Sequence, residues 1–389
     1  MNYRKIKGLQ ITFALLIGLS VVAETGFGDI PKHNERRTHQ SRRHVMRDEV
    51  FSTGYIKTAL LKATKWQLEH PKHSPTDWTN GAFYAGVFAA YETTKSPLIL
   101  DSLMAMGERN KWRPGARFDH ADDIAICQTY IDLYRLKKDR QMIQPTIDSV
   151  RKMQTVPGKE LEKHGLTWWW CDALFMAPPV LAKLSATLNN PTYNMFSDSL
   201  FRQTYTLLYS QQEHLFARDA NYLLDATGAG KKESNGQKIF WSRGNGWVMG
   251  GLVRVLEELP VKHPSRPFYL MLFRQMSERL LALQQADGLW RASLLDPAAY
   301  PGGEASGSGF DCYALAWGIN QGILAKKTYQ PAVEKSWIAL TKLVSPEGRV
   351  GWVQPIGGDP RRNFSEDSWE VYGTGAFLLA GSQIIKLKP

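Results

Sequence analysis

The spacing of apolar residues is the feature that most constrains the fold, because it follows a helical period in twelve segments after Phe51. These segments are 51–70, 78–94, 99–109, 121–137, 139–154, 171–188, 191–210, 243–259, 265–285, 307–325, 328–343 and 367–386. Proline, glycine or asparagine lies at several of their ends. Twelve successive helices predict six helical hairpins, which can close into a ring of inner and outer helices. We therefore expect an all-α toroid.

The longer connections between these helices carry most of the aromatic and polar strings. Short β-prone pieces occur in them, namely LFARD, KIFWSR, LWRASLL and RVGWVQP. Such pieces predict short β-hairpins on one rim of the toroid. Loops held on a rigid helical scaffold are where binding and catalytic residues usually lie.

The first residues are typical of an exported protein. Residues 1–23 predict a signal peptide, with a basic start, an apolar run and a small-residue cleavage site. The apolar run is shorter than the roughly 20 residues that a membrane span needs. Residues 24–50 predict a flexible basic leader, and residues 51–389 predict a single domain. We expect export to the periplasm and no membrane association after signal cleavage.

The net charge limits the kinds of partner that the chain can bind, and the cysteines limit its disulfide and zinc chemistry. The formal net charge of +11 suits either acidic glycans or simple solubility, and export argues against a nucleic-acid partner. The three cysteines, Cys127, Cys171 and Cys312, are odd in number and widely spaced. They predict buried free thiols rather than a disulfide framework or a zinc site.

The string TWWWCDALFMAPP is the most informative for function. Three consecutive tryptophans precede Asp172, and neighbouring side chains of a helix or a strand cannot all face one core. At least one ring is therefore expected to face a ligand. Aromatic rings beside a carboxylate are typical of proteins that bind a sugar and perform acid chemistry on it. The alternatives are that the rings are core and that Asp172 only caps a helix.

A second acidic cluster, HADDI, begins at His120 and again opens an apolar helix. One of its two aspartates, Asp122 or Asp123, is expected to be the N-cap, and the other can face the same cavity as Asp172. Paired carboxylates are typical of glycoside chemistry. A divalent-metal site is an alternative, but no further ligand run completes it.

Two glycine-rich strings complete the candidate site. In SRGNGWVMGG, Arg243 and Trp247 are four residues apart and can share a helix face, where an Arg fork suits a carboxylate. This string lacks the strand and third glycine of a nucleotide-binding loop. In EASGSGF, Ser306 and Ser308 precede a helix and suit sugar hydroxyls or a carboxylate, although an ordinary helix start is the alternative.

Together these strings resemble glycoside hydrolase family 105, the unsaturated rhamnogalacturonyl hydrolases, which are related to the unsaturated glucuronyl hydrolases of family 88. The matching strings are HADDIA, WWWCDALFMA, FWSRGNGWVMGGLVRVLEELP, LWRASLLDP, EASGSGFDCYALAWGIN and GWVQPIGG. The resemblance implies an (α/α)6 barrel over residues 51–389. It also implies removal of a 4,5-unsaturated uronic acid from the non-reducing end of lyase-generated oligosaccharides. We expect a monomer that needs no metal or cofactor.

The resemblance also implies roles for individual residues. Asp172 protonates C4 of the enol ether and helps water add to C5, with Asp123 or Asp122 as the second carboxylate. Trp170 and Trp247 are implied to be platforms for the sugar ring, and Trp78 an early stacking aromatic. Arg243 is implied to be a polar contact. The other expected substrate contacts are His120, Ser306 and Ser308.

One departure from the family pattern concerns the second sugar. Many relatives carry a histidine where this chain has Arg218. An arginine there suits an acidic or sulfated neighbouring sugar, or the uronate itself.

Two other classes of protein fit the same residues. One is another (α/α)6 enzyme, either an inverting glycosidase or a sugar epimerase that acts on saturated sugars. The other is a non-catalytic glycan-binding protein that keeps the aromatic pocket without the acid.

Overall fold

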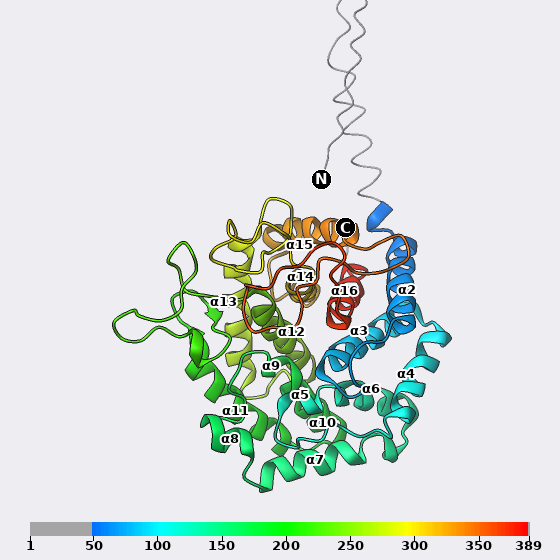
Figure 1. The fold of residues 1–389 in the computed structure, drawn as a ribbon. Coiled ribbons are helices and arrows are strands. Elements are labelled where there is room, and N and C mark those ends of the chain that lie inside the picture. The colour runs from blue at the N-terminus through cyan, green and yellow to red at the C-terminus, as the bar shows by residue number, and fades with distance from the viewer. Residues whose placement is uncertain (1–48, 388–389) are drawn as a thin grey trace, which may run out of the picture. The chain divides into compact units, whose positions relative to one another are not determined.

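Six helices form a closed inner ring in the computed structural model, which describes residues 49–387 (Figure 1). The inner helices are α3 (Trp78–Thr94), α6 (Cys127–Lys137), α10 (Pro178–Leu188), α12 (Ser242–Glu258), α14 (Ala305–Asn320) and α16 (Val371–Ile384). Each packs against the next along the chain, and α16 packs against α3 to close the ring. The signal and nearly all of the leader predicted above lie outside the described residues.

Six outer helices alternate with the inner ones along the chain and surround the ring (Figure 1). They are α2 (Thr53–Glu69), α4 (Pro97–Arg109), α7 (Gln144–Thr155), α11 (Thr192–Leu208), α13 (Arg266–Leu283) and α15 (Lys326–Lys342). Most of them bury one face and expose the other, whereas α14 and α16 are buried along almost their whole length. The predicted (α/α)6 toroid is confirmed.

Small residues let the first and last inner helices meet. A Cβ atom at Gly86 of α3 would collide with the backbone of Gly375 in α16. A Cβ atom at Gly375 would in turn collide with the backbone of Ala82. Because both positions lack a side chain, the two backbones approach closely enough to close the ring.

Several predicted helices are divided in the structure. Segment 121–137 becomes α5 (Ala121–Ile124) and α6, and segment 139–154 becomes η1 (Arg140–Met142) and α7. Segment 171–188 becomes α9 (Ala173–Met176) and α10, which begins at Pro178, a residue without a backbone N–H. The sequence reasoning missed α8 (Lys159–His164), which buries no residue and so has no apolar period.

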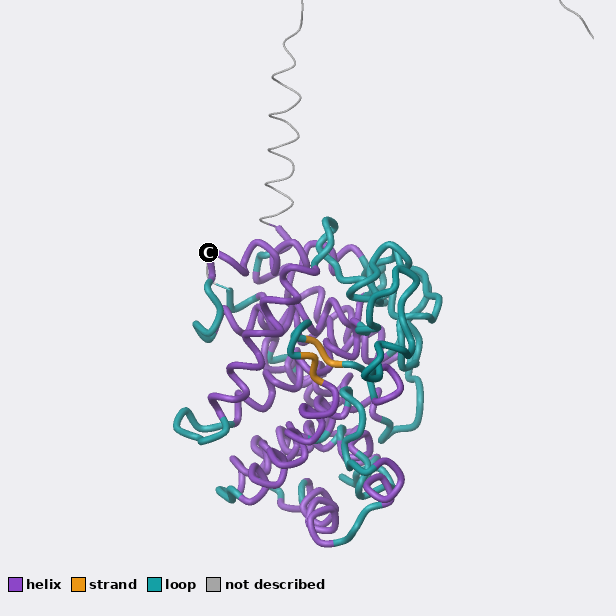
Figure 2. Tube along the Cα trace, turned by 90° about the vertical axis from the view of Figure 1, so that its left-hand side faces the viewer, coloured by secondary structure: helices purple, strands orange, loops and turns teal. Residues whose placement is uncertain are grey.

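The rim loops contain less β-structure than the sequence predicts. One antiparallel pair of strands forms among residues 49–387, β1 (Tyr209–Ser210) with β2 (Leu215–Phe216), followed by the short helix η2 (Ala220–Tyr222). The other β-prone pieces contribute isolated bridges, such as Trp241 with Ser293. Long loops gather at one end of the ring (Figure 2). No helix in the described part of the chain is long and apolar enough to cross a membrane.

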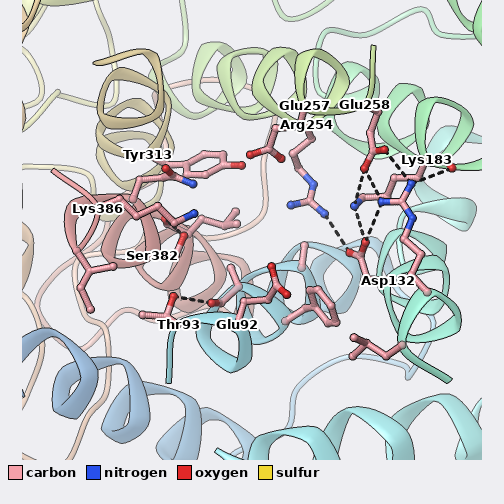
Figure 3. A pocket seen from close by; sticks show the side chains of 18 of the residues that line it. Glu92, Thr93, Asp132, Lys183, Arg254, Glu257, Glu258, Tyr313, Ser382 and Lys386 are labelled. Carbon is pink, nitrogen blue, oxygen red and sulfur yellow. Dashed lines mark hydrogen bonds and ion pairs between the residues drawn. The ribbon is translucent and has the colours of Figure 1, made fainter. Parts of the chain in front are cut away.

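The opposite end of the ring holds a polar cavity of about 470 Å³, lined by the C-terminal parts of inner helices (Figure 3). Lys183 Nζ lies 2.6 Å from Asp132 Oδ1, and Arg135 donates to both carboxylate oxygens of Glu258, at 2.7 and 2.8 Å. The buried guanidinium of Arg254 lies beside Asp132. Cations at helix C-termini offset the negative end of the helix dipole. This network therefore links α6, α10 and α12 where they converge.

Glu258→Gln tests the contribution of the network to stability. Burial alone would raise the pKa of Glu258, but the hydrogen bonds from Arg135 and the charge of Lys183 outweigh it and lower that pKa. Glu258 therefore stabilises the fold above its unfolded pKa of about 4.3, and this contribution disappears as the pH falls through the lower folded value. We expect a loss of about 2 kcal/mol at neutral pH, measured by urea unfolding.

The loss should shrink in acid, where wild-type Glu258 is itself protonated. Glu108→Gln is the matched control, because Glu108 lies on the outer helix α4, is exposed and has no ion pair among residues 49–387. A loss for Glu258→Gln that does not depend on pH, or an equal loss for Glu108→Gln, would contradict this account.

Candidate active site

Two backbone segments meet at the loop-rich end of the ring and position the central acid. Trp170 forms a bridge with Asp219, and the backbone N–H of Cys171 donates to the carbonyl of Arg218 at 2.9 Å. This pairing places Asp172, which follows at once, beside the dipeptide Arg218–Asp219.

Asp172 is 7% exposed and precedes α9 without capping it, because its carboxylate accepts no hydrogen bond from the helix backbone. The alternative that Asp172 is only a helix cap is therefore wrong. Its Oδ1 accepts a hydrogen bond from the Cys171 thiol, with Sγ at 3.2 Å. Burial raises the pKa of Asp172, and the opposing charge of Arg218 only partly offsets that effect.

The two neighbouring aspartates have different surroundings. Asp123 accepts hydrogen bonds from Arg117, at 2.7 Å from its backbone N–H and 3.0 Å from Nε. Asp122 has no arginine partner among residues 49–387; its Oδ2 lies 3.7 Å from His120 Nδ1, and its side chain is 20% exposed. Burial and the charge of Asp172 raise the pKa of Asp122 to about 8. The structure therefore brings Asp122, rather than Asp123, together with Asp172.

The expectation that an aspartate caps this helix is wrong. His120 is the N-cap of α5, and its Nδ1 accepts from the backbone N–H of Asp122 at 3.3 Å. The His120 ring also packs on Trp170, with ring centroids 4.7 Å apart. His120 thus connects the acidic helix start to the aromatic string.

The three consecutive tryptophans do not all face the core. Trp168 is buried in the core, where its carbonyl accepts from Thr204, and Trp169 is half-exposed. Trp170 is 3% exposed and is covered by His120 and Trp169, so it is not an open ring platform. The ring that faces outward is Trp169.

Trp247 is also not an open platform. It is fully buried and packs against Phe175 and Phe310, because its helix α12 lies inside the ring. Trp78, at the start of α3, is half-buried and stacks on Tyr372, with its edge toward Trp247. Trp247 therefore supports Trp78, which is the ring nearer to solvent.

Arg243, which the sequence predicts to be a substrate contact, is fully buried. Its guanidinium lies between the rings of Trp241 and Tyr372. It donates to the carbonyls of Gln354 and Pro355, at 2.7 and 2.9 Å. Arg243 therefore holds the last rim loop against the ring.

Ser306 and Ser308 are fully buried as well, and neither is available to a sugar. Ser306 donates to Glu304 at 2.6 Å, and Ser308 Oγ accepts from the backbone N–H of Trp290 at 2.9 Å. Glu304 is the N-cap of α14 and also accepts from the backbone N–H of Gln354 at 3.1 Å. The EASGSGF string is thus a helix start rather than a binding loop.

Arg218 has side-chain donors without a partner. Its Nη1 donates to Asp219 at 2.6 Å, but Nε is buried with no hydrogen-bond partner in the described part of the chain. The guanidinium packs on the backbone at Gly358, and it lies 5.4 Å from the centroid of the Trp169 ring. Arg218 therefore presents a cation between Asp172 and the half-exposed Trp169.

Sequence reasoning missed three groups at this site. Asp219 accepts from Arg218, Tyr372 supports Trp78 and Arg243, and the Cys171 thiol contacts Asp172. Only Tyr372 could have been found from the sequence, because it lies at the start of the last predicted helical segment, as Asp172 lies at the start of its own. Within residues 49–387, no group of three or more His, Cys, Asp and Glu side chains is placed to hold a metal ion.

Comparison with known proteins identifies the family. Residues 55–388 match the family model described as Glycosyl Hydrolase Family 88. The chain is 43% identical to an unsaturated 3S-rhamnoglycuronyl hydrolase of Formosa agariphila, over 86% of this chain and 91% of the relative. It is 32% identical to a protein of the same name from an Alteromonas species, over 99% of each chain.

Among solved structures, a polysaccharide lyase superposes with a TM-score of 0.79 at 32% identity, covering 86% of this chain and 97% of the other. The chain therefore belongs to the unsaturated uronyl hydrolases described by the family 88 model, the group that includes the family 105 enzymes its sequence resembles.

Proposed function

We propose that this hydrolase removes an unsaturated uronate from a sulfated rhamnose, with Asp172 as the proton donor and Asp122 as its partner. Two relatives named for a 3S-rhamnoglycuronyl substrate support the substrate class. The observation that carries the mechanism is the pair of desolvated carboxyls: burial raises the pKa of both, and the charge of Asp172 raises the pKa of Asp122 further.

Such a pair retains one proton near neutral pH. Burial disfavours two carboxylates in one site, so the second ionisation requires a pH above the ordinary range of aspartate. The substrate is an enol ether, and its hydration begins with proton transfer to carbon. A carboxylic acid that stays protonated at neutral pH is suited to that step.

The proposed steps account for every atom. Asp172 transfers its proton to C4 while the C4=C5 electron pair forms the new C–H bond, and the ring oxygen stabilises the cation at C5. Water adds to C5 and returns a proton to Asp172. The hemiketal then opens by breaking the bond from C5 to the ring oxygen, and the hemiacetal left at C1 releases the remaining sugar.

Arg218 supports the anionic character of the proposed substrate. Its Nε has no hydrogen-bond partner among the described residues, and its guanidinium lies 5.4 Å from the centroid of the Trp169 ring, on which His164 stacks. The Arg218 side chain is more exposed than Asp172, which supports assigning it to the second sugar, where a sulfate is expected. A guanidinium binds such an anion through paired N–H donors.

The purified chain should destroy the ultraviolet absorbance of unsaturated oligosaccharides prepared with a lyase, because hydration removes the conjugated double bond. The Asp172→Asn variant should fold normally and lose roughly a hundredfold or more of this rate, since an amide cannot transfer the proton. An increase of absorbance on intact polysaccharide would instead indicate lyase activity, as in the related structure, and would contradict the proposal.

Asp122→Asn and Asp123→Asn form a matched pair that tests which aspartate shares the proton. Removing the Asp122 charge should lower the pKa of Asp172, so the alkaline limb of the kcat profile should move to lower pH by roughly one unit or more. Asp123→Asn should leave that limb in place, because Asp123 pairs with Arg117. A larger shift for Asp123→Asn would reverse the assignment.

Arg218→Ala should weaken binding of a substrate with a sulfated second sugar by about 10- to 100-fold, since a charge-assisted contact contributes about 1.5 to 3 kcal/mol. The same disaccharide without sulfate should lose much less affinity. Arg361→Ala is the control, because this exposed rim arginine pairs with Asp359. Equal losses on both substrates would assign Arg218 to the uronate instead of the second sugar.

A further inference from the structure

The thiol of Cys171 is a buried polar group that the proposed mechanism does not use. Its residue is 0% exposed, and its Sγ lies 3.2 Å from Asp172 Oδ1. Among the residues that the structure describes, the thiol is the only hydrogen-bond donor to the Asp172 carboxylate. Since Oδ1 accepts from the thiol, Oδ2 is the oxygen left for a substrate.

The thiol has little freedom to leave this contact. The backbone N–H of Cys171 is held by the carbonyl of Arg218. On the other side, a Cβ atom at Gly244 would lie 3.2 Å from Cys171 Sγ and 3.7 Å from Asp172 Oδ1. The first turn of α12 therefore packs directly against the thiol and the carboxylate.

The other two cysteines provide a comparison within the same chain. Cys127 and Cys312 are also fully buried, on the inner helices α6 and α14. The Cys312 thiol donates instead to the carbonyl of Val333, with Sγ 3.9 Å from the oxygen. Burial alone therefore does not distinguish Cys171, but its contact with a carboxylate does.

We propose that Cys171 is a positioning residue for the proton donor: its thiol donates to Oδ1 of Asp172, fixes the rotation of the carboxyl group and directs Oδ2 to the substrate. This proposal rests on the proposed function of Asp172. The thiol acts only through Asp172 and needs no contact with the sugar.

The contact also affects how readily Asp172 ionises. Several elements contribute charged or titratable groups that interact with Asp172. These groups are Cys171 beside it, Arg218 and Asp219 of the rim loop, Arg243 of α12, Asp122 of α5 and Tyr372 of α16. Burial and the neighbouring carboxylates favour the neutral acid, whereas the two arginines and the thiol favour the carboxylate. Removing the thiol should therefore raise the pKa of Asp172.

A direct titration tests the proposal without relying on turnover. The carboxyl carbons of aspartate are labelled with ¹³C in the full chain, and the Asp172 resonance is assigned by its absence from Asp172→Asn. Cys171→Ala should raise the pKa of Asp172 by about half a unit to one unit, because a thiol is a weak donor to a charged acceptor. Cys171→Ser, which restores a donor, should return the pKa toward the wild-type value.

Two further variants separate positioning from packing. Cys171→Val fills the space without a donor, so it should shift the pKa as Cys171→Ala does, and it provides a second test if alanine destabilises the fold. Cys312→Ala removes a buried thiol that donates to the carbonyl of Val333 and has no contact with Asp172, so it should leave the Asp172 titration unchanged. An unchanged pKa in both donor-free variants at Cys171, or an equal shift in Cys312→Ala, would overturn the proposal.

Kinetics then distinguish this inference from the proposed function. If Asp172 is the proton donor, the alkaline limb of kcat in Cys171→Ala should move upward with the titrated pKa. A shifted titration with an unmoved limb would uphold the thiol contact but contradict Asp172 as the acid. A wild-type chain that fails to act on any unsaturated uronide would also contradict the proposed function, while the titration would still decide the role of Cys171.

Discussion

The close contact between α3 and α16 is the constraint on which the site depends. Glycine at positions 86 and 375 lets the first and last inner helices touch through their backbones, and this contact closes the ring. Closure brings Trp78, at the start of α3, against Tyr372, at the start of α16. Residues nearly three hundred positions apart thereby line one site, and a bulkier residue at either glycine would separate them.

The two ends of the ring balance charge in opposite ways. Cations pair with acids where the inner helices end, and Asp132 and Glu258 each have a close partner there. At the other end, Asp172 and Asp122 both lie at helix starts, where the helix dipole favours anions. Desolvation still prevails, since the pKa of both groups is raised, and the charge of Asp172 adds to the effect on Asp122. Exclusion of water is therefore the main reason why Asp172 and Asp122 hold their protons more tightly than exposed aspartates do.

The sequence predicted the ring well because each helix has its own apolar period, which is a local property. It also pointed to Asp172, whose helix start lies beside three tryptophans. It could not separate Asp122 from Asp123, since that choice depends on Arg117 reaching back to one of them. It also could not show that Arg243, Trp247 and Ser308 are buried, for a related reason. Buried Arg, Trp and Ser at a helix start resemble ligand contacts until their partners in distant loops are known, as Gln354 is for Arg243.

The rings of Phe175, Trp247 and Phe310, all fully buried, fill the middle of the barrel between its two ends. An oligosaccharide therefore cannot pass along the barrel axis between these rings. A closed axis suits an enzyme that removes an unsaturated uronic acid from oligosaccharides, because such an enzyme takes up the end of a chain and has no need of a tunnel. In this barrel the barrier consists of hydrophobic packing alone.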